Sequence, residues 1–161
     1  MIRSWEVFVM ADTISIFDAA NWFLKKESMS DKKLQKLCYY MYAWGQALLR
    51  KQVFQDTIFQ AWAHGPVSPE LYHECKEYGW TNIPKDKFSN ASSITNEDIK
   101  HLLESVWVTY GDKDANELEA LTHREAPWIL ARAGAQSGER SNNPLSDSVV
   151  REFYQGIYNG D

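Results

Sequence analysis

The longest amphipathic stretch of the chain is residues 32–51, KKLQKLCYYMYAWGQALLRK. Apolar residues recur in it every three or four positions, which is the repeat of an α-helix that packs one face on a core. That stripe comprises Leu34, Leu37, Cys38, Met41, Gly45, Leu48 and Leu49. Tyr40 and Trp44 form a second row, with Lys33 and Lys36 beneath them. A helix that is apolar on more than one side is expected at the centre of the fold or at a partner surface.

Shorter helices are expected around this central one. The helical repeat predicts them at about 15–26, 69–78, 96–110, 114–121 and 128–133, with a last helix capped by Ser146. Residues 53–63 are rich in β-branched and aromatic types and predict a short strand or hairpin arm. The expected fold is mainly α, a compact single-domain bundle of six to seven helices with one short β-hairpin near residues 53–63. We expect residues 1–13 to be an N-terminal tail or extension and residues 14–161 to form the domain.

The charge of the chain is acidic and unevenly distributed. Its 161 residues include 17 lysines and arginines against 22 aspartates and glutamates, for a net charge of −5. Residues 25–51 carry seven basic and two acidic residues, so this stretch is +5 and the remainder is −10. An acidic chain disfavours direct nucleic-acid binding, which needs a surplus of lysine and arginine. Without a long apolar run, a signal-peptide pattern or a CxxC motif, the sequence predicts a cytoplasmic protein with no membrane partner.

Sequence patterns of known catalytic and metal sites are absent. The chain has no HExxH motif, no paired CxxC motif and no glycine-rich phosphate loop. Cys38 and Cys75 fall on apolar helical faces, where cysteine usually serves as a small buried hydrophobe. Either cysteine could still meet His64 or His123 in space and form a nucleophile pair. We therefore predict no catalytic residue, metal or cofactor, and keep a small hydrolase or transferase using His64 or His123 as the alternative.

Residues 61–76, AWAHGPVSPELYHECK, predict a rigid turn that leads into a helix. Gly65 permits a positive φ at this turn. The turn gathers Trp62, His64 and Tyr72 around one helix N-terminus, where free amides could receive an anion or a partner's carboxylate. The alternative is a tight structural corner with aromatic packing.

Three lysines of the central helix, Lys32, Lys33 and Lys36, are candidates for a basic patch on one face. One interpretation is a nucleic-acid surface on which Tyr39, Tyr40 and Trp44 stack, although the acidic charge of the chain disfavours it. A second is an exposed, solvated face whose neighbouring aromatics fill the core. A third is a surface that attracts an acidic partner, whose association would then be sensitive to salt.

Three motifs, in order along the chain, are similar to those of a known family. Residues 31–40, DKKLQKLCYY, resemble its K-L-Q-K-L-x-Y-Y helix. Residues 59–67, FQAWAHGPV, followed by Leu71 and Tyr72, resemble its A-W-x-x-G-P-V-x-x-x-L-Y core. Residues 121–128, LTHREAPW, resemble its L-T-H-x-E-x-P-W element. Together the motifs resemble the Panacea domain, also called the SocA-like antitoxin or phage-associated GepA family, from about residue 14 to the last helix.

The resemblance implies a small bacterial or prophage antitoxin that neutralises a cognate protein toxin, encoded by the neighbouring gene, through direct contact. Two alternatives share this binding logic: an adaptor that delivers the toxin to a AAA+ protease, and a phage-encoded inhibitor of a host or defence protein. The resemblance supplies no catalytic residues, and a homo-oligomer is compatible with it. Because interfaces favour tryptophan and tyrosine as anchors, we expect partner contacts at Tyr40, Trp44, Trp62, His64 and Tyr72.

Overall fold

The central helix α3, Asp31–Trp44, is buried along nearly its whole length in the computed structural model, which describes residues 13–160. Of its 14 residues, 12 are buried. The Ser30 hydroxyl begins the helix by accepting a hydrogen bond from the Lys33 amide, which satisfies one of the free amides of the first turn. Burial on all sides places α3 at the centre of the fold, as its apolar pattern indicates.

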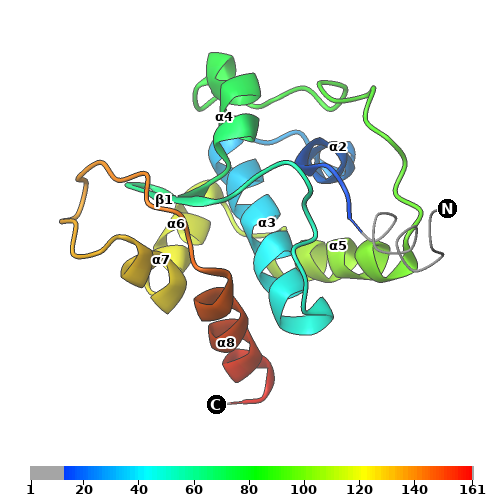
Figure 1. Ribbon diagram of the computed structural model, residues 1–161. Helices are drawn as coiled ribbons and strands as arrows, with labels where there is room; N and C mark the ends of the chain where they lie inside the picture. The colour runs from blue at the N-terminus through cyan, green and yellow to red at the C-terminus, as the bar shows by residue number, and fades with distance from the viewer. Residues whose placement is uncertain (1–12, 161) are drawn as a thin grey trace, which may run out of the picture.

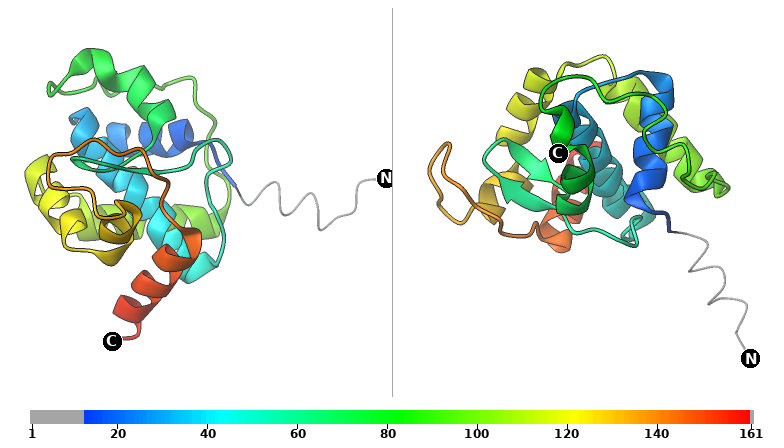
Figure 2. Two further views of the ribbon diagram at one scale, coloured as in Figure 1. Left: turned by 60° about the vertical axis from the view of Figure 1, so that its left-hand side comes forward. Right: turned by 90° about the horizontal axis from the view of Figure 1, so that it is seen from above.

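Six further α-helices surround α3 in the described part of the chain (Figures 1 and 2). They are α2 (Ile16–Lys26), α4 (Pro69–Cys75), α5 (Glu97–Tyr110), α6 (Ala115–His123), α7 (Ala126–Ala131) and α8 (Asp147–Tyr158). All except α7 make extensive contacts with α3, and α7 packs on α6, α8 and the hairpin. A single 3₁₀ turn, Lys76–Tyr78, extends α4. The predicted mainly α bundle is therefore confirmed.

The predicted hairpin is present, with its first strand inside residues 53–63 and its second strand just beyond them. Strand β1, Gln60–Trp62, pairs antiparallel with β2, Gly65–Val67. Residues 53–59 instead form a loop that passes over α3 before reaching β1 (Figure 1). Val53, Phe54 and Phe59 are buried in the core, and the pairing of this segment is limited to an isolated parallel bridge between Phe54 and Ile14. Their β-branched and aromatic character therefore mainly reflects burial.

The central helix is shorter than the predicted range of 32–51. Its α-helical part ends at Trp44, and a π-helical turn, Gly45–Leu49, follows. Arg50 then takes a left-handed conformation, with φ 55°, and turns the chain back. A Cβ atom on Gly45 would lie 2.7 Å from Cγ1 of Val53, so the returning loop packs directly against the end of the helix.

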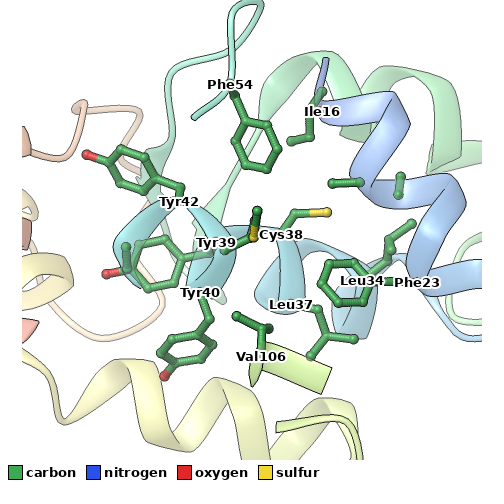
Figure 3. Close-up of a cluster of buried hydrophobic side chains, with 14 of the residues drawn as sticks. Ile16, Phe23, Leu34, Leu37, Cys38, Tyr39, Tyr40, Tyr42, Phe54 and Val106 are labelled. Atoms are coloured by element: carbon green, nitrogen blue, oxygen red, sulfur yellow. The ribbon is translucent and has the colours of Figure 1, made fainter. Parts of the chain in front are cut away.

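The core on one side of α3 is built from tyrosines. Tyr39, Tyr40 and Tyr42 are all at most 2% exposed, and Figure 3 shows their hydroxyls directed away from the aliphatic cluster around Leu34 and Leu37. The ring of Tyr40 stacks on Tyr110 of α5 with centroids 3.9 Å apart. Buried tyrosine hydroxyls need hydrogen-bond partners, so this side of the core must contain polar acceptors.

Two sequence-based expectations are limited by the range that the structure covers. Residues 1–12 of the predicted tail lie outside the described residues. Within residues 13–160, no helix combines the length and the apolar character that a membrane crossing requires.

Candidate functional site

Side chains of α3 hold the hairpin in place. Gln35 Nε2 donates to the carbonyl oxygen of Ser68 at 3.1 Å, and Gln35 Oε1 accepts from the amide of Ser68 at 2.8 Å. Lys36 Nζ donates to the carbonyl oxygen of Pro66 at 3.3 Å. Gln35 and Lys36 are each 1% exposed. Since buried polar groups are costly unless they are hydrogen-bonded, these contacts define one position for β2 on α3.

The lysines of α3 do not form the basic patch that the sequence suggested. Lys36 is buried, and so is Lys33, whose Nζ donates to the carbonyl oxygen of Gly111 at 2.7 Å. Lys32 alone keeps a partly exposed side chain, and its Nζ lies 2.9 Å from Oε1 of Glu119. The expectation of an exposed Lys32–Lys33–Lys36 surface is therefore wrong, because two of the three ammonium groups bind backbone carbonyls inside the fold.

Burial of Lys36 makes the stability of the fold depend on pH. Loss of solvent lowers the pKa of its ammonium group from 10.5 to about 8, while Asp31 and Glu119 act in the opposite direction. Between about pH 8 and pH 10.5 the unfolded chain therefore binds more protons than the folded chain. The contribution of Lys36 to the free energy of unfolding therefore increases as the pH rises from about 8 to 10.5. The same contribution is lost as the pH falls through about 8.

We expect the melting temperature of the wild type, measured relative to that of Lys36→Met, to increase from about pH 7.5 to about pH 9.5. The increase should be several degrees, because 1 kcal/mol corresponds to roughly 2–4 °C for a chain of this size. The measurement stops at about pH 9.5 because tyrosines of the unfolded chain ionise near pH 10. A difference between the two proteins that stays flat or decreases with pH would contradict this account of Lys36.

A carboxylate that receives two tyrosine hydroxyls connects α3, α7 and α8. Tyr40 Oη and Tyr154 Oη donate to the same oxygen, Oε1 of Glu125, at 2.7 Å and 2.8 Å. Tyr39 Oη lies 2.9 Å from Tyr154 Oη. Burial raises the pKa of Glu125, an effect that the two tyrosine donors oppose, and burial also raises the pKa of Tyr39, Tyr40 and Tyr154. Among the residues predicted to contact a partner, Tyr40 is thus fully buried and belongs to this internal network.

Trp44, the second predicted contact residue on α3, is separate from the hairpin. Its Nε1 donates to the hydroxyl of Tyr110 at 2.8 Å, and its half-buried ring packs on Tyr154. It lies at the C-terminal end of α3, whereas the hairpin packs near Gln35 and Lys36. The structure therefore does not bring Tyr40 and Trp44 together with the other three predicted residues.

Four aromatic side chains form a continuous surface feature, which we call the aromatic strip: Tyr72, Trp62, Trp128 and His123. The rings of Tyr72 and Trp62 meet edge to face with centroids 4.9 Å apart. Trp128 Nε1 donates to the carbonyl oxygen of Trp62 at 2.8 Å, and His123 stacks on Trp128 with centroids 3.9 Å apart. All four residues keep part of their surface in solvent, and Tyr72 is 38% exposed. The strip thus joins α4, β1, α7 and α6 at one surface.

His64 stands beside the strip at the turn of the hairpin. Its side chain is 79% exposed, and its Nδ1 lies 3.0 Å from Oε1 of Glu119. The same carboxylate oxygen receives the ammonium of Lys32. The predicted grouping of Trp62, His64 and Tyr72 around the turn agrees with their placement.

His123 contributes a stacked aromatic ring to the strip. Burial lowers the pKa of its imidazole from the ordinary 6.5, which favours the neutral ring. Its Nε2 atom is buried, without a hydrogen-bond partner. Stacking on Trp128 fixes the plane of the ring.

Both cysteines are free and buried. Burial raises the pKa of Cys38, and that of Cys75 to about 12, which disfavours the reactive thiolate. In residues 13–160, no group of three or more histidine, cysteine, aspartate or glutamate side chains is placed to hold a metal ion.

Sequence reasoning did not select the polar residues that support the strip. Gln35 and Glu125 lie in the family motifs but were not singled out, and Arg132 was missed altogether. The 3% exposed Arg132 donates from Nη1 to the carbonyl oxygen of Ala61 at 3.2 Å, and its guanidinium lies over the Trp128 ring. For Gln35, the signal in the sequence was a polar residue on a helix that is otherwise apolar on every side.

Comparisons with known proteins agree with the three motifs. The family model for "Antitoxin SocA-like, Panacea domain" matches residues 34–129, more than half of the chain and a range that includes the whole strip. The chain is 28% identical over 138 residues to Antitoxin SocA of Caulobacter vibrioides (strain NA1000 / CB15N), covering 79% of this chain and 72% of the relative. No solved structure matches the chain significantly. The chain therefore belongs to the SocA-like Panacea domain family.

Proposed function

We propose that the protein is a cytoplasmic antitoxin that neutralises a protein toxin by binding it at the aromatic strip and at the adjoining hairpin turn. The family to which the chain belongs and the name of its relative in Caulobacter vibrioides support the antitoxin role. The single observation that carries the binding site is the continuity of the strip. Its four part-exposed side chains come from four elements. The rings of Tyr72 and Trp62 meet, the indole of Trp128 binds the backbone carbonyl of Trp62, and His123 stacks on Trp128.

The strip has the properties of a binding surface with little to reorganise. A few central residues carry most of the binding energy at protein interfaces, and tryptophan and tyrosine are enriched among them. The contacts from Trp128 and Arg132 to the backbone of β1 hold the strip on the rest of the fold. Because these side chains are already ordered, binding loses less conformational entropy than it would with a mobile surface.

We expect Tyr72→Ala and His64→Ala, combined, to abolish the rescue of growth when the protein is co-expressed with the product of the neighbouring gene. Each anchor residue that is lost at the centre of an interface typically costs about 1–2 kcal/mol or more, which is tenfold or greater in affinity for the pair. The matched control is Trp80→Ala, since Trp80 is 92% exposed and lies outside the strip. Rescue by the control and not by the double variant is the expected outcome.

The abundance of the toxin in the same co-expressing cells distinguishes two mechanisms of neutralisation. Undiminished toxin abundance during rescue supports occlusion of the toxin, whereas a shortened toxin lifetime indicates delivery to a AAA+ protease. A neighbouring gene product that is harmless alone, or toxic and not rescued by the wild type, removes the antitoxin proposal. Full rescue by the Tyr72→Ala, His64→Ala variant removes the strip as the binding site.

A further inference from the structure

A groove adjoins the aromatic strip, between the loop at residues 52–60, the start of α4 and the start of α8. Its volume is about 620 Å³, and it is open to solvent. Phe54, Ile58 and Pro69 supply apolar lining. Gln60 lines the groove and also accepts the Nε1–H of Trp62 at 2.8 Å, so the groove and the strip form one continuous surface.

One wall of the groove is a fixed segment with unpaired main-chain groups. In the described residues, the backbone of Asp56, Thr57 and Ile58 makes no hydrogen bond. Thr57 between them is buried, and its hydroxyl lies 2.6 Å from both Ser68 Oγ and Glu70 Oε1. Ile58 is 66% exposed. A rigid segment with free amides and carbonyls can pair with the main chain of an extended partner, and an exposed isoleucine adds apolar contact.

The groove carries three carboxylates that form no ion pair with a cation of residues 13–160. Asp56, Glu70 and Asp147 line it, and its lining contains no lysine or arginine. Each carboxylate is held by neutral donors: Asp56 by the Ser15 hydroxyl and the Ile16 amide, Glu70 by Thr57, and Asp147 by Tyr42. No ion pair within residues 13–160 reaches any of the three. These fixed negative charges favour a partner of positive charge.

We propose that the groove receives an extended basic segment of a protein partner. Lysine or arginine side chains of that segment lie beside Glu70 and Asp147, apolar side chains alternate with them against Ile58, and the partner's main chain runs along residues 56–58. The groove extends the surface of the aromatic strip. The inference therefore rests on the proposed function in one respect, which is that the toxin is the protein that supplies the segment. The preference for a basic segment follows from the charges of the groove and does not depend on the identity of the partner.

The test uses the full-length protein and two fluorescein-labelled peptides, one with alternating arginine and valine and one with alternating glutamate and valine. We expect fluorescence anisotropy to detect binding of the basic peptide and not of the acidic one. The variant Glu70→Gln, Asp147→Asn keeps the acceptor oxygens but removes two charges, and should weaken binding roughly three- to tenfold and reduce its salt dependence. Glu104→Gln, Glu152→Gln removes two exposed carboxylates outside the groove and is the matched control.

A second variant, Ile58→Lys, introduces a cation into the groove at an exposed position that the fold does not need. It should abolish binding of the basic peptide without lowering the melting temperature. Equal binding of the two peptides, or equal loss in the groove variant and the matched control, would overturn the inference.

Growth rescue separates this inference from the proposed function. If the wild type binds the basic peptide selectively but does not rescue growth, the groove proposal is supported and the antitoxin proposal is contradicted. The opposite result is that substitutions in the strip abolish rescue while substitutions of Glu70, Asp147 and Ile58 do not change peptide binding. That result would support the antitoxin role and contradict the groove proposal.

Discussion

The substitution Gly65→Ala is expected to destabilise the protein by about 2–4 kcal/mol and to abolish toxin rescue. Gly65 has φ +112°, a conformation that L side chains rarely adopt. An added Cβ would lie 2.5 Å from Lys36 Cε and 3.0 Å from Thr122 Oγ1. Lys36 is buried and bonded to the carbonyl oxygen of Pro66, so it cannot move aside without losing that contact. The hairpin would therefore have to shift away from α3, and the strip with it.

Chemical denaturation of the wild type and the variant measures this loss of stability. Gly138→Ala is the matched control, because Gly138 also has a positive φ of +80° but has no atom within 4 Å of the added Cβ. The control should lose only the conformational contribution, about 1 kcal/mol. Equal losses in the two variants would show that packing against Lys36 and Thr122 is not the cause.

The second large effect is expected for Glu125→Ala, at about 3–5 kcal/mol of lost stability. The substitution leaves the buried hydroxyls of Tyr40 and Tyr154 without their acceptor. It also opens a cavity where α3, α7 and α8 meet, and each unsatisfied buried donor costs about 1–3 kcal/mol. Because α7 contributes Trp128 to the strip, we expect weaker toxin rescue as well.

Glu125→Gln provides the comparison for this prediction. The amide oxygen can still accept from both tyrosines, so the loss in free energy of unfolding should be clearly smaller than for alanine. Tyr154→Phe removes one hydroxyl and should cost about 1 kcal/mol. If alanine and glutamine at position 125 destabilise the protein equally, the shared acceptor is not what holds α8 on the core.

The sequence by itself determined the helices and most of their starting points. Helical periodicity depends on residues three and four positions apart, so α3, α5 and α8 can be located from local pattern alone. Ser30 and Ser146 cap α3 and α8 as their side-chain chemistry predicts. The three motifs were also sufficient to indicate the family that the family model then showed.

Only the tertiary structure decided which polar and aromatic residues face the interior. The lysines of α3 have the spacing of a solvated face, yet Lys33 and Lys36 bind carbonyl oxygens that are 78 and 30 residues away in the chain. Tyr40 has the chemistry of an interface anchor, but Glu125, 85 residues away, accepts its hydroxyl in the core. Trp62 and Trp128 become neighbours across 66 residues. Local sequence fixes the face of a helix on which a side chain lies, whereas its burial depends on the distant segment that the fold packs against that face.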